Sequence, residues 1–308
     1  MPYSEQYRRQ VELLVRVLPF VADEPCFALK GGTAINLFVR DMPRLSVDID
    51  LTYLPVQSRA DSLEAIDAAM KRIAIASGSG SPAEDIVPAS PNKEGAVTKL
   101  LARGNGVQIK IEVTPVLRGC VFEAEERTVM PAVEDVFGYA EMQVVSFADL
   151  YGGKVVAALD RQHPRDLFDV RDLLANEGIT DDLRRAFIVY LLSHDRPMHE
   201  VIGPTRKDIG QEFERGFAGM TKEPIDLDEL LNARESLINA VVGEMPEDHK
   251  AFLIGFEKGS PDWSLLGIEH VPELPAVQWR QLNLDKMSSH ARSQLVEQLE
   301  RKLSEKAT

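Results

Sequence analysis

Apolar and polar positions along the chain follow two different periods, and each period predicts its own kind of element. In residues 7–18 and 62–76 the apolar positions recur every three or four residues, which predicts two amphipathic helices. Residues 46–51 alternate strictly instead, which predicts a strand. Its apolar positions 47, 49 and 51 are expected to face a core, and Ser46, Asp48 and Asp50 share the opposite face.

Two further runs, residues 97–102 and 107–116, have the alternation and the β-branched content of strands. Asn105-Gly106 between them is typical of a tight hairpin turn. In the second run the apolar positions belong inside, which leaves Glu112 on the polar face. Residues 78–92 are rich in Gly, Ser and Pro and are expected to form a loop.

The pattern becomes helical after residue 145. Ser146 is expected to cap a helix that continues to residue 159, and Pro164 fits the first position of a helix ending at residue 175. His163 is expected to lie in the loop or cap before it. Thr180 can cap the next helix, and further helices are expected over 227–242, 247–257 and 288–303. The sequence therefore predicts an N-terminal α/β lobe, residues 1–145, and a helical lobe, residues 146–308.

The residues around the strand at 46–51 suggest an anion site and a metal site. After an apolar run at 27–29, Gly31 and Gly32 let the backbone turn tightly and approach a bulky anion. Thr33 is expected to cap a helix over 34–39. Asp48 and Asp50 lie about 7 Å apart on one strand face and repel each other, and a divalent cation removes that repulsion. This order of features favours a Mg²⁺–NTP site; the alternative is an ordinary solvated edge strand.

A second group of charged residues lies in the helical half. Lys154 is on one helix, Arg161 follows two turns later, and Asp166 and Asp169 share a face of the next helix. A lysine can hold a triphosphate and an aspartate can orient an acceptor hydroxyl. The alternative is a salt-bridge network that joins these four residues and Arg171.

Composition limits the class of protein and its partners. The 308 residues are 44% hydrophobic and 27% charged, as in a globular protein, and no apolar run approaches the ~20 residues of a membrane span. Cys26 and Cys120 form no disulfide framework and are expected to be buried, and the first residues lack an export signal, so a cytoplasmic location is expected. The net charge of −14 requires a local basic patch if RNA is a substrate, and it suits a basic partner such as an antitoxin.

The chain resembles the nucleotidyltransferase toxins of the AbiEii/AbiGii type, within the DNA polymerase β-like nucleotidyltransferase superfamily. The superfamily's GG or GS turn, helix and D-x-D strand are matched by Gly31, Gly32, Thr33, Asp48 and Asp50. The later family motif K-x-x-A-L-x-x-R-x-x-x-R-D-x-x-D is matched in order by Lys154, Ala158 (one residue late), Leu159, Arg161, Arg165, Asp166 and Asp169.

The resemblance implies an α+β fold, with a polymerase β-like N-terminal lobe built on a mixed sheet and a helical C-terminal lobe that completes the cleft. It also implies Mg²⁺-dependent transfer of NMP from an NTP, with Mn²⁺ as the alternative metal and the 3′ end of tRNA as the leading acceptor. The biological role would be that of the toxin in a type IV-like toxin–antitoxin or abortive-infection system. The superfamily often has a third carboxylate on a later strand, which points to Glu112; its alternative role is an ordinary strand glutamate near Lys110.

The site residues expected from these arguments fall into three groups. Those expected to be catalytic are Asp48, Asp50, Lys154, Asp169 and Asp166, with Asp169 favoured over Asp166 to face the nucleotide; those expected to bind nucleotide are Lys30, Gly31, Gly32, Thr33, Arg44, Ser46 and Arg161; those expected to bind metal are Asp48, Asp50 and Glu112. Arg44 could instead pair with Asp41 or Asp48. Rival functions are NMP transfer to a protein or small-molecule hydroxyl, and a catalytically silent binding protein.

Overall fold

The computed structural model describes residues 4–80 and 85–305, with the backbone alone described for 77–80, and the chain divides into two compact units. The first unit comprises Met1–Ser146 and Ala218–Ile225, and the second comprises Phe147–Phe217 and Asp226–Thr308. The observed division after residue 146 lies one residue from the predicted one. The return of residues 218–225 to the first unit differs from the prediction, which placed them in the helical lobe.

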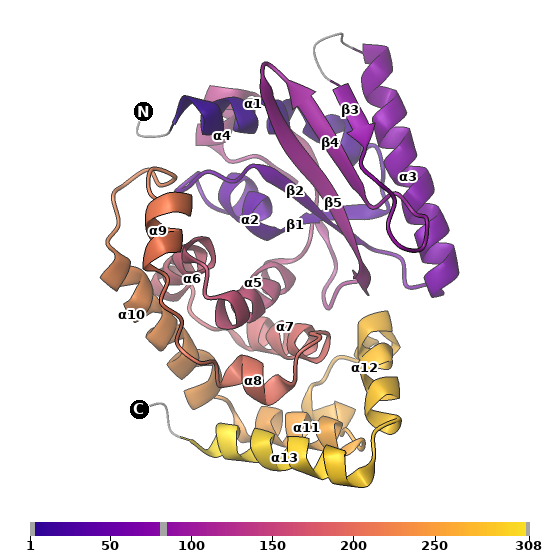
Figure 1. Ribbon diagram of the computed structural model, residues 1–308, viewed down its shortest axis with the longest axis vertical. Helices are drawn as coiled ribbons and strands as arrows, with labels where there is room; N and C mark the ends of the chain where they lie inside the picture. Colours follow the sequence, from indigo (N-terminus) through magenta and orange to yellow (C-terminus); the bar gives the residue numbers. More distant parts are fainter. Residues whose placement is uncertain (1–3, 81–84, 306–308) are drawn as a thin grey trace. The chain divides into compact units, whose positions relative to one another are not determined.

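The first unit is built on a seven-stranded mixed sheet with the order β3-β4-β5-β2-β1-β7-β6 (Figure 1). The pairs β2–β5 and β1–β7 are parallel, and the other neighbours are antiparallel. The α+β fold class is thus confirmed. The elements are α1 (Glu5–Ala22), β1 (Phe27–Lys30), α2 (Gly31–Thr33), the π-helical turn η1 (Ala34–Val39), β2 (Asp48–Tyr53), α3 (Arg59–Gly80), β3 (Asp85–Pro88), β4 (Lys99–Gly104), β5 (Val107–Arg118), β6 (Glu125–Thr128), α4 (Pro131–Phe137) and β7 (Glu141–Val144).

Hydrophobic burial on the predicted faces holds this sheet together. In α1 the predicted apolar stripe is buried against β5 and β7, and Ser4 caps the helix by accepting from the Tyr7 N–H. In β2, Ile49 and Leu51 are fully buried while Asp48 and Asp50 are only partly covered, as the alternation predicted. The strand begins at Asp48 rather than residue 46, and Val47, expected to face the core, is only half-buried. The apolar period therefore decided which face of β2 carries the carboxylates.

Two local predictions around β3 and β4 had different outcomes. The Asn105-Gly106 hairpin is confirmed: both residues have positive φ values, +50° and +74°, as a tight turn between right-twisted strands requires. The predicted loop over 78–92 was wrong in part, because α3 continues to Gly80 and β3 pairs with β4 over residues 85–88. Residues 81–84 of that predicted loop lie outside the described part of the chain. Pairing with β4 outweighed the turn-forming composition.

The segment 218–225 joins the first unit by backbone pairing. The Leu45 N–H donates to the Met220 carbonyl at 2.9 Å, and the Lys222 N–H donates to the Pro43 carbonyl at 2.9 Å. Between them Arg44 and Thr221 form an antiparallel bridge. These bonds hold the chain just before β2, so a segment distant in sequence supports the start of the D-x-D strand.

The second unit is helical, as predicted. Helix α7 begins after Thr180, whose hydroxyl caps it by accepting from the Leu183 N–H, and α6 begins at Pro164; both starts are as expected. Three of the described helices of this unit were not predicted: α8 (Met198–Ile202), α9 (Gly210–Gly216) and α12 (Pro275–Asp285). The elements are α5 (Phe147–Arg161), α6 (Pro164–Asn176), α7 (Asp181–Leu192), α8 (Met198–Ile202), α9 (Gly210–Gly216), α10 (Leu227–Ile238), the π-helical turn η2 (Asn239–Gly243), α11 (Glu247–Lys258), the 3-10 turns η3 (Trp263–Leu265) and η4 (Val271–Glu273), α12 (Pro275–Asp285) and α13 (Ser289–Ser304).

Glu257, on α11, makes the stability of the second unit depend on pH. The residue is 1% exposed, and its pKa is raised by burial, with Arg280 and Arg292 acting in the opposite direction. Among the described residues, its Oε2 has no hydrogen-bond partner, and its Oε1 lies 3.9 Å from Arg280 Nη2. A carboxyl whose folded pKa is raised contributes stability below its unfolded pKa, and this contribution is lost as pH rises through the folded value.

We therefore expect Glu257→Gln to be more stable than the wild type at pH 8, by about 1 kcal/mol, and to lose this advantage at pH 4. Urea unfolding of both proteins at the two pH values measures the difference. Glu297→Gln, a change at an exposed carboxylate on α13, serves as the control. An advantage that persists unchanged at pH 4 would show that protonation of Glu257 is not the cause.

The structure bears on two further predictions, which concern membrane-spanning segments and the two cysteines. No helix in the described residues is long and apolar enough to cross a bilayer. Among the described residues Cys26 and Cys120 form no disulfide, and each is only partly buried, in contrast to the predicted burial. Burial of the Cys26 thiol, with a smaller effect from Glu24, nevertheless raises its pKa to about 11, which keeps it protonated at neutral pH.

Candidate functional site

Asp50, the second carboxylate of the D-x-D pair, lies in a row of charged residues that crosses four neighbouring strands of the first unit. Asp50 on β2 is paired with Lys30 on β1 and, on its other side, with Glu112 on β5. Glu112 is in turn paired with Lys99 on β4. Residues paired across a sheet share a face, so the row reads Lys30, Asp50, Glu112, Lys99. The Figure 1 labels β1, β2, β5 and β4 locate its strands.

Burial disfavours charge at the centre of this row. The pKa of Asp50 is raised, first by burial and then by the neighbouring charge of Asp48. The pKa of Lys30 is lowered by burial, while the charge of Asp50 acts in the opposite direction. A divalent cation beside Asp48 and Asp50 would remove the repulsion that raises the Asp50 pKa, because it adds positive charge next to both carboxylates.

Glu112 lies beside Asp50, as a role in metal binding requires. It also forms ion pairs with lysines, as expected if it is an ordinary strand glutamate near Lys110. Its Oε2 is 3.0 Å from Lys110 Nζ and 3.5 Å from Lys99 Nζ. Lys110 is itself paired across the sheet with Asp48. No three carboxylate, histidine or cysteine side chains in the described ranges 4–80 and 85–305 converge as a ready metal cage. Asp48 and Asp50 thus fit a divalent cation as they stand, and Glu112 could join them only by giving up its lysine contacts. Oxygens of a substrate would complete the shell.

Both glycines of the Gly31-Gly32 turn are required by close contacts. Gly31 has φ +76°, and a β-carbon added there would lie 2.8 Å from Asp50 Oδ2. One added at Gly32 would lie 2.8 Å from Arg44 Nη2 and 2.9 Å from Ser46 Oγ. The absence of side chains lets the turn touch the D-x-D carboxylate on one residue and a guanidinium on the next.

This geometry predicts that substituting Gly31 and Gly106, two glycines with nearly the same φ, will have different effects on activity. Gly31→Ala and Gly106→Ala should each lose about 1–2 kcal/mol of stability, because φ is +76° at Gly31 and +74° at Gly106. Nothing lies within 4 Å of a β-carbon at Gly106, whereas at Gly31 it would displace Asp50. Nucleotide transfer should therefore fall at least tenfold in Gly31→Ala only, measured beside thermal unfolding. Equal activity in the two variants would contradict the contact argument.

Thr33 does not cap a helix, contrary to prediction. The helical backbone already begins at Gly31, so Thr33 lies inside it and is fully buried. Its hydroxyl donates to the Asp48 carbonyl and lies 3.1 Å from Ser46 Oγ. The residue therefore joins the glycine turn to the start of β2 rather than facing an anion.

Arg44 is held in place by the chain around it. It is 2% exposed, and its Nη1 donates to the Leu45 carbonyl at 2.9 Å. Its Nη2 lies against Gly32, on the side where Ser46 Oγ is also close. The bridge to Thr221 fixes its backbone. Four of the predicted nucleotide-binding residues therefore lie next to one another in space: Gly31, Gly32, Arg44 and Ser46.

In the second unit the predicted cation and carboxylates do converge. Lys154 on α5 lies between two carboxylates of α6: its Nζ is 2.9 Å from Asp166 Oδ1 and 3.0 Å from Asp169 Oδ2. Arg161 Nη2 contacts the other oxygen of Asp166 at 2.8 Å. Lys154, Asp166 and Asp169 are all buried, whereas the Arg161 side chain is largely exposed. A buried lysine between two buried carboxylates has a fixed position, which both a structural and a catalytic role require.

The sequence-based expectations for two neighbouring residues, Arg171 and His163, had different outcomes. Arg171, expected in the same network, instead pairs with Asp172 at 2.7 Å and Glu229 at 3.4 Å and stacks on Phe168. His163 is the N-cap of α6, as anticipated, with Nδ1 accepting from the Arg165 N–H at 3.1 Å.

Sequence reasoning overlooked Lys99 and Gln162, and it considered Lys110 only as a partner of Glu112. Lys110 and Lys99 share the face of the D-x-D carboxylates, and the alternation that placed Glu112 there had already placed Lys110, two residues earlier, beside it. Gln162, at the corner between α5 and α6, gave no signal, because its role depends on contacts with residues more than 40 positions away.

Comparisons with known proteins agree with this fold. The family model described as "Nucleotidyl transferase AbiEii toxin, Type IV TA system" matches residues 12–280. Among solved structures, MenT4, a nucleotidyltransferase toxin from Mycobacterium tuberculosis H37Rv, is similar with a TM-score of 0.61 and 14% sequence identity. The match covers 90% of this chain and 93% of that one, and at this identity it shows the fold alone. No curated protein matches the sequence.

Proposed function

This chain belongs to the AbiEii family of nucleotidyl transferase toxins of type IV toxin–antitoxin systems, and on that premise we propose that it transfers NMP from an NTP to the 3′-terminal hydroxyl of tRNA. In this reaction the acceptor oxygen bonds to the α-phosphorus, the bond from that phosphorus to the bridging oxygen breaks, and pyrophosphate leaves. Family membership makes the protein a nucleotidyltransferase toxin with an antitoxin partner. The donor, the metal and the acceptor are the parts proposed here.

The contact between Gly31 and Asp50 carries the proposal. It places a turn without side chains directly against a carboxylate pair suited to a cation, so that a phosphate chain bound at the turn would lie beside that cation. Mg²⁺, or Mn²⁺ in its place, would be held by Asp48 and Asp50 with Glu112 as the third carboxylate, and would polarise the α-phosphate and lower the pKa of the attacking hydroxyl. Arg44, Ser46 and Lys30 would position the triphosphate.

The helical unit would contribute Lys154, Asp166 and Asp169. We assign Lys154 to the charge that develops as pyrophosphate leaves, and Arg161 to a phosphate contact, because both are cations held by carboxylates at fixed distances. Asp169, or Asp166 if Asp169 stays with Lys154, would orient the acceptor hydroxyl. These assignments follow the order of the family motif.

One observation favours a different acceptor. A basic patch beside the D-x-D face would favour tRNA, but the lysines there lie beside carboxylates: Lys99 and Lys110 both contact Glu112, and Lys30 is paired across the sheet with Asp50. With a net charge of −14, the chain offers an RNA backbone little further attraction. Transfer to a protein or small-molecule hydroxyl is therefore the second candidate.

The deciding experiment incubates the purified protein with Mg²⁺, each α-³²P-NTP in turn, and total tRNA, beside Asp48→Ala and Lys154→Ala. Label on tRNA with one NTP, absent from both variants, would support the proposal and identify the donor. Label on a protein or a small molecule would support the second candidate. A wild type that labels nothing in any of these reactions would overturn the proposed reaction.

A further inference from the structure

Gln162, in the corner between α5 and α6, has an unusual backbone. Its φ is +53°, in the left-handed region that residues other than Gly, Asn and Asp seldom adopt, and it is 1% exposed. Such a conformation persists where the surrounding structure imposes it, and it is enriched at functional sites. Its position in the chain is directly between Arg161 and the α6 cap His163.

The side-chain amide of Gln162 bonds to two other segments of the second unit. Its Nε2 donates to the Thr205 carbonyl at 2.8 Å. Its Oε1 accepts from the Lys207 N–H at 3.0 Å and from Arg234 Nη1 on α10 at 3.1 Å. Arg234 Nη1 also donates to the Lys207 carbonyl at 2.9 Å, which closes the network. The amide thus fastens the α5–α6 corner to the loop after α8 and to α10.

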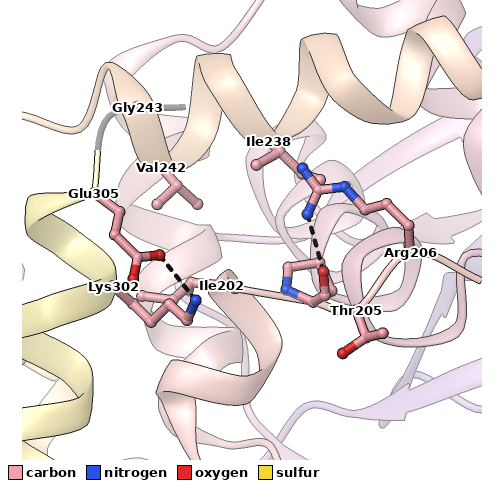
Figure 2. Close-up of a pocket in the computed structure, with 10 residues that line it drawn as sticks. Ile202, Thr205, Arg206, Ile238, Val242, Gly243, Lys302 and Glu305 are labelled. Atoms are coloured by element: carbon pink, nitrogen blue, oxygen red, sulfur yellow. Dashed lines mark hydrogen bonds and ion pairs between the residues drawn. The ribbon is translucent and has the colours of Figure 1, made fainter. Parts of the chain in front are cut away.

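The loop that receives Gln162 is itself firmly anchored. Arg206 pairs with Glu235 on α10 at 2.7 Å, and its Nη1 donates to the Pro204 carbonyl at 2.9 Å. Lys207 Nζ donates to the Asp160 carbonyl at 2.8 Å. The other side of this loop lines a pocket of about 340 Å³ (Figure 2), together with Ile202, Ile238, Val242 and Lys302. Gln162 is therefore attached to a fixed point.

The corner sets the distance between Lys154 and its carboxylates. Lys154 lies on α5 and both aspartates lie on α6, so their approach to 2.9 Å and 3.0 Å depends on how the chain turns between the helices. Only Gln162 and His163 separate the two helices. A change in backbone direction at Gln162 would swing α6 and its carboxylates as a unit relative to Lys154.

We propose that Gln162 is a positioning residue for nucleotidyl transfer, which holds Lys154, Asp166 and Asp169 in their working arrangement through its amide bonds to the Thr205–Lys207 loop and Arg234. This inference rests on the proposed role of the Lys154 cluster. It assigns to the side chain, rather than to the left-handed backbone alone, the task of fixing the corner.

The test compares Gln162→Gly with Asn105→Gly. Glycine accepts a positive φ at both positions, and only the first change removes amide bonds to the anchored loop and α10. Transfer rates are measured together with the rate at which an acylating reagent modifies Lys154, followed by mass spectrometry, and with the unfolding midpoint. The labelling reports opening of the corner without any need for activity.

We expect Gln162→Gly to lower kcat/KM for transfer at least tenfold and to speed Lys154 acylation at least fivefold under conditions where both variants are folded. Its midpoint should be lower than that of Asn105→Gly, because three buried hydrogen bonds are lost, and Asn105→Gly should change neither rate. Transfer or acylation by Gln162→Gly within twofold of the wild type would overturn the inference. Full activity in Lys154→Ala would instead overturn the proposed role of the cluster, and the acylation result would still report whether Gln162 fixes the corner.

Discussion

Asp48→Asn is expected to slow nucleotide transfer about 10³-fold while leaving the protein folded. The change removes one of the two carboxylates that fit a divalent cation, and loss of about 4 kcal/mol of charge stabilisation in the transition state corresponds to that factor. The isosteric amide keeps the volume of the side chain, and the Thr33 hydroxyl bonds to the Asp48 backbone rather than to its carboxylate. Single-turnover transfer measures the loss.

The same variant should be at least as stable as the wild type at pH 7 to 8. The charge of Asp48 is one cause of the raised Asp50 pKa, and a raised carboxyl pKa means that stability is lost as pH rises through it. Removing that charge therefore lessens the loss, while Mn²⁺ binding followed by electron paramagnetic resonance should weaken. A variant that unfolds, or that binds Mn²⁺ like the wild type, would contradict the assignment of Asp48.

Glu112→Gln separates the two roles available to Glu112. As the third carboxylate it should weaken Mn²⁺ binding and transfer by about 10–100-fold, a smaller effect than that of Asp48→Asn, because its Oε2 already contacts Lys110 and Lys99. Lys99→Gln, which removes one of these ion pairs without touching a carboxylate, is the matched control. Wild-type Mn²⁺ binding in Glu112→Gln would assign Glu112 to the lysines alone.

The largest expected loss of stability is in Lys154→Ala. Lys154 is 8% exposed and lies between Asp166 and Asp169, so its removal takes the shared cation from two buried carboxylates, of which Asp166 keeps its contact with Arg161, and should cost about 3–5 kcal/mol. Transfer should also be lost. Urea unfolding measures the first effect, and label transfer the second. A loss below about 1 kcal/mol would indicate that the cluster relaxes without Lys154.

A compensated variant distinguishes structural from catalytic loss. Lys154→Met with Asp169→Asn removes one buried charge of each sign, and the remaining Asp166 keeps its contact with Arg161. Replacing a buried ion pair by neutral groups is often close to neutral in stability, so most of the loss should be recovered. Transfer should remain absent. Recovery of transfer together with stability would show that Lys154 acts only in the fold.

The fold of each unit follows largely from local patterns. The strict alternation in residues 46–51 fixed which residues of β2 carry charge outward, and Asn105-Gly106 fixed the hairpin, because neighbouring residues alone determine these features. Pro164 and His163 likewise determined where α6 begins. Where composition opposed long-range pairing, as in β3, the pairing decided the outcome.

By itself, then, the sequence determined the family, the fold class, and the pairing of a glycine turn with two carboxylates on one strand face. Only the tertiary structure decided that Asp50 lies against Gly31 and beside Glu112, that Thr33 bonds to β2, and that Gln162 fastens the α5–α6 corner. The physical reason is that a local pattern sets the direction of a side chain within its own element. The neighbours it meets are set by packing and strand register between segments that lie tens of residues apart.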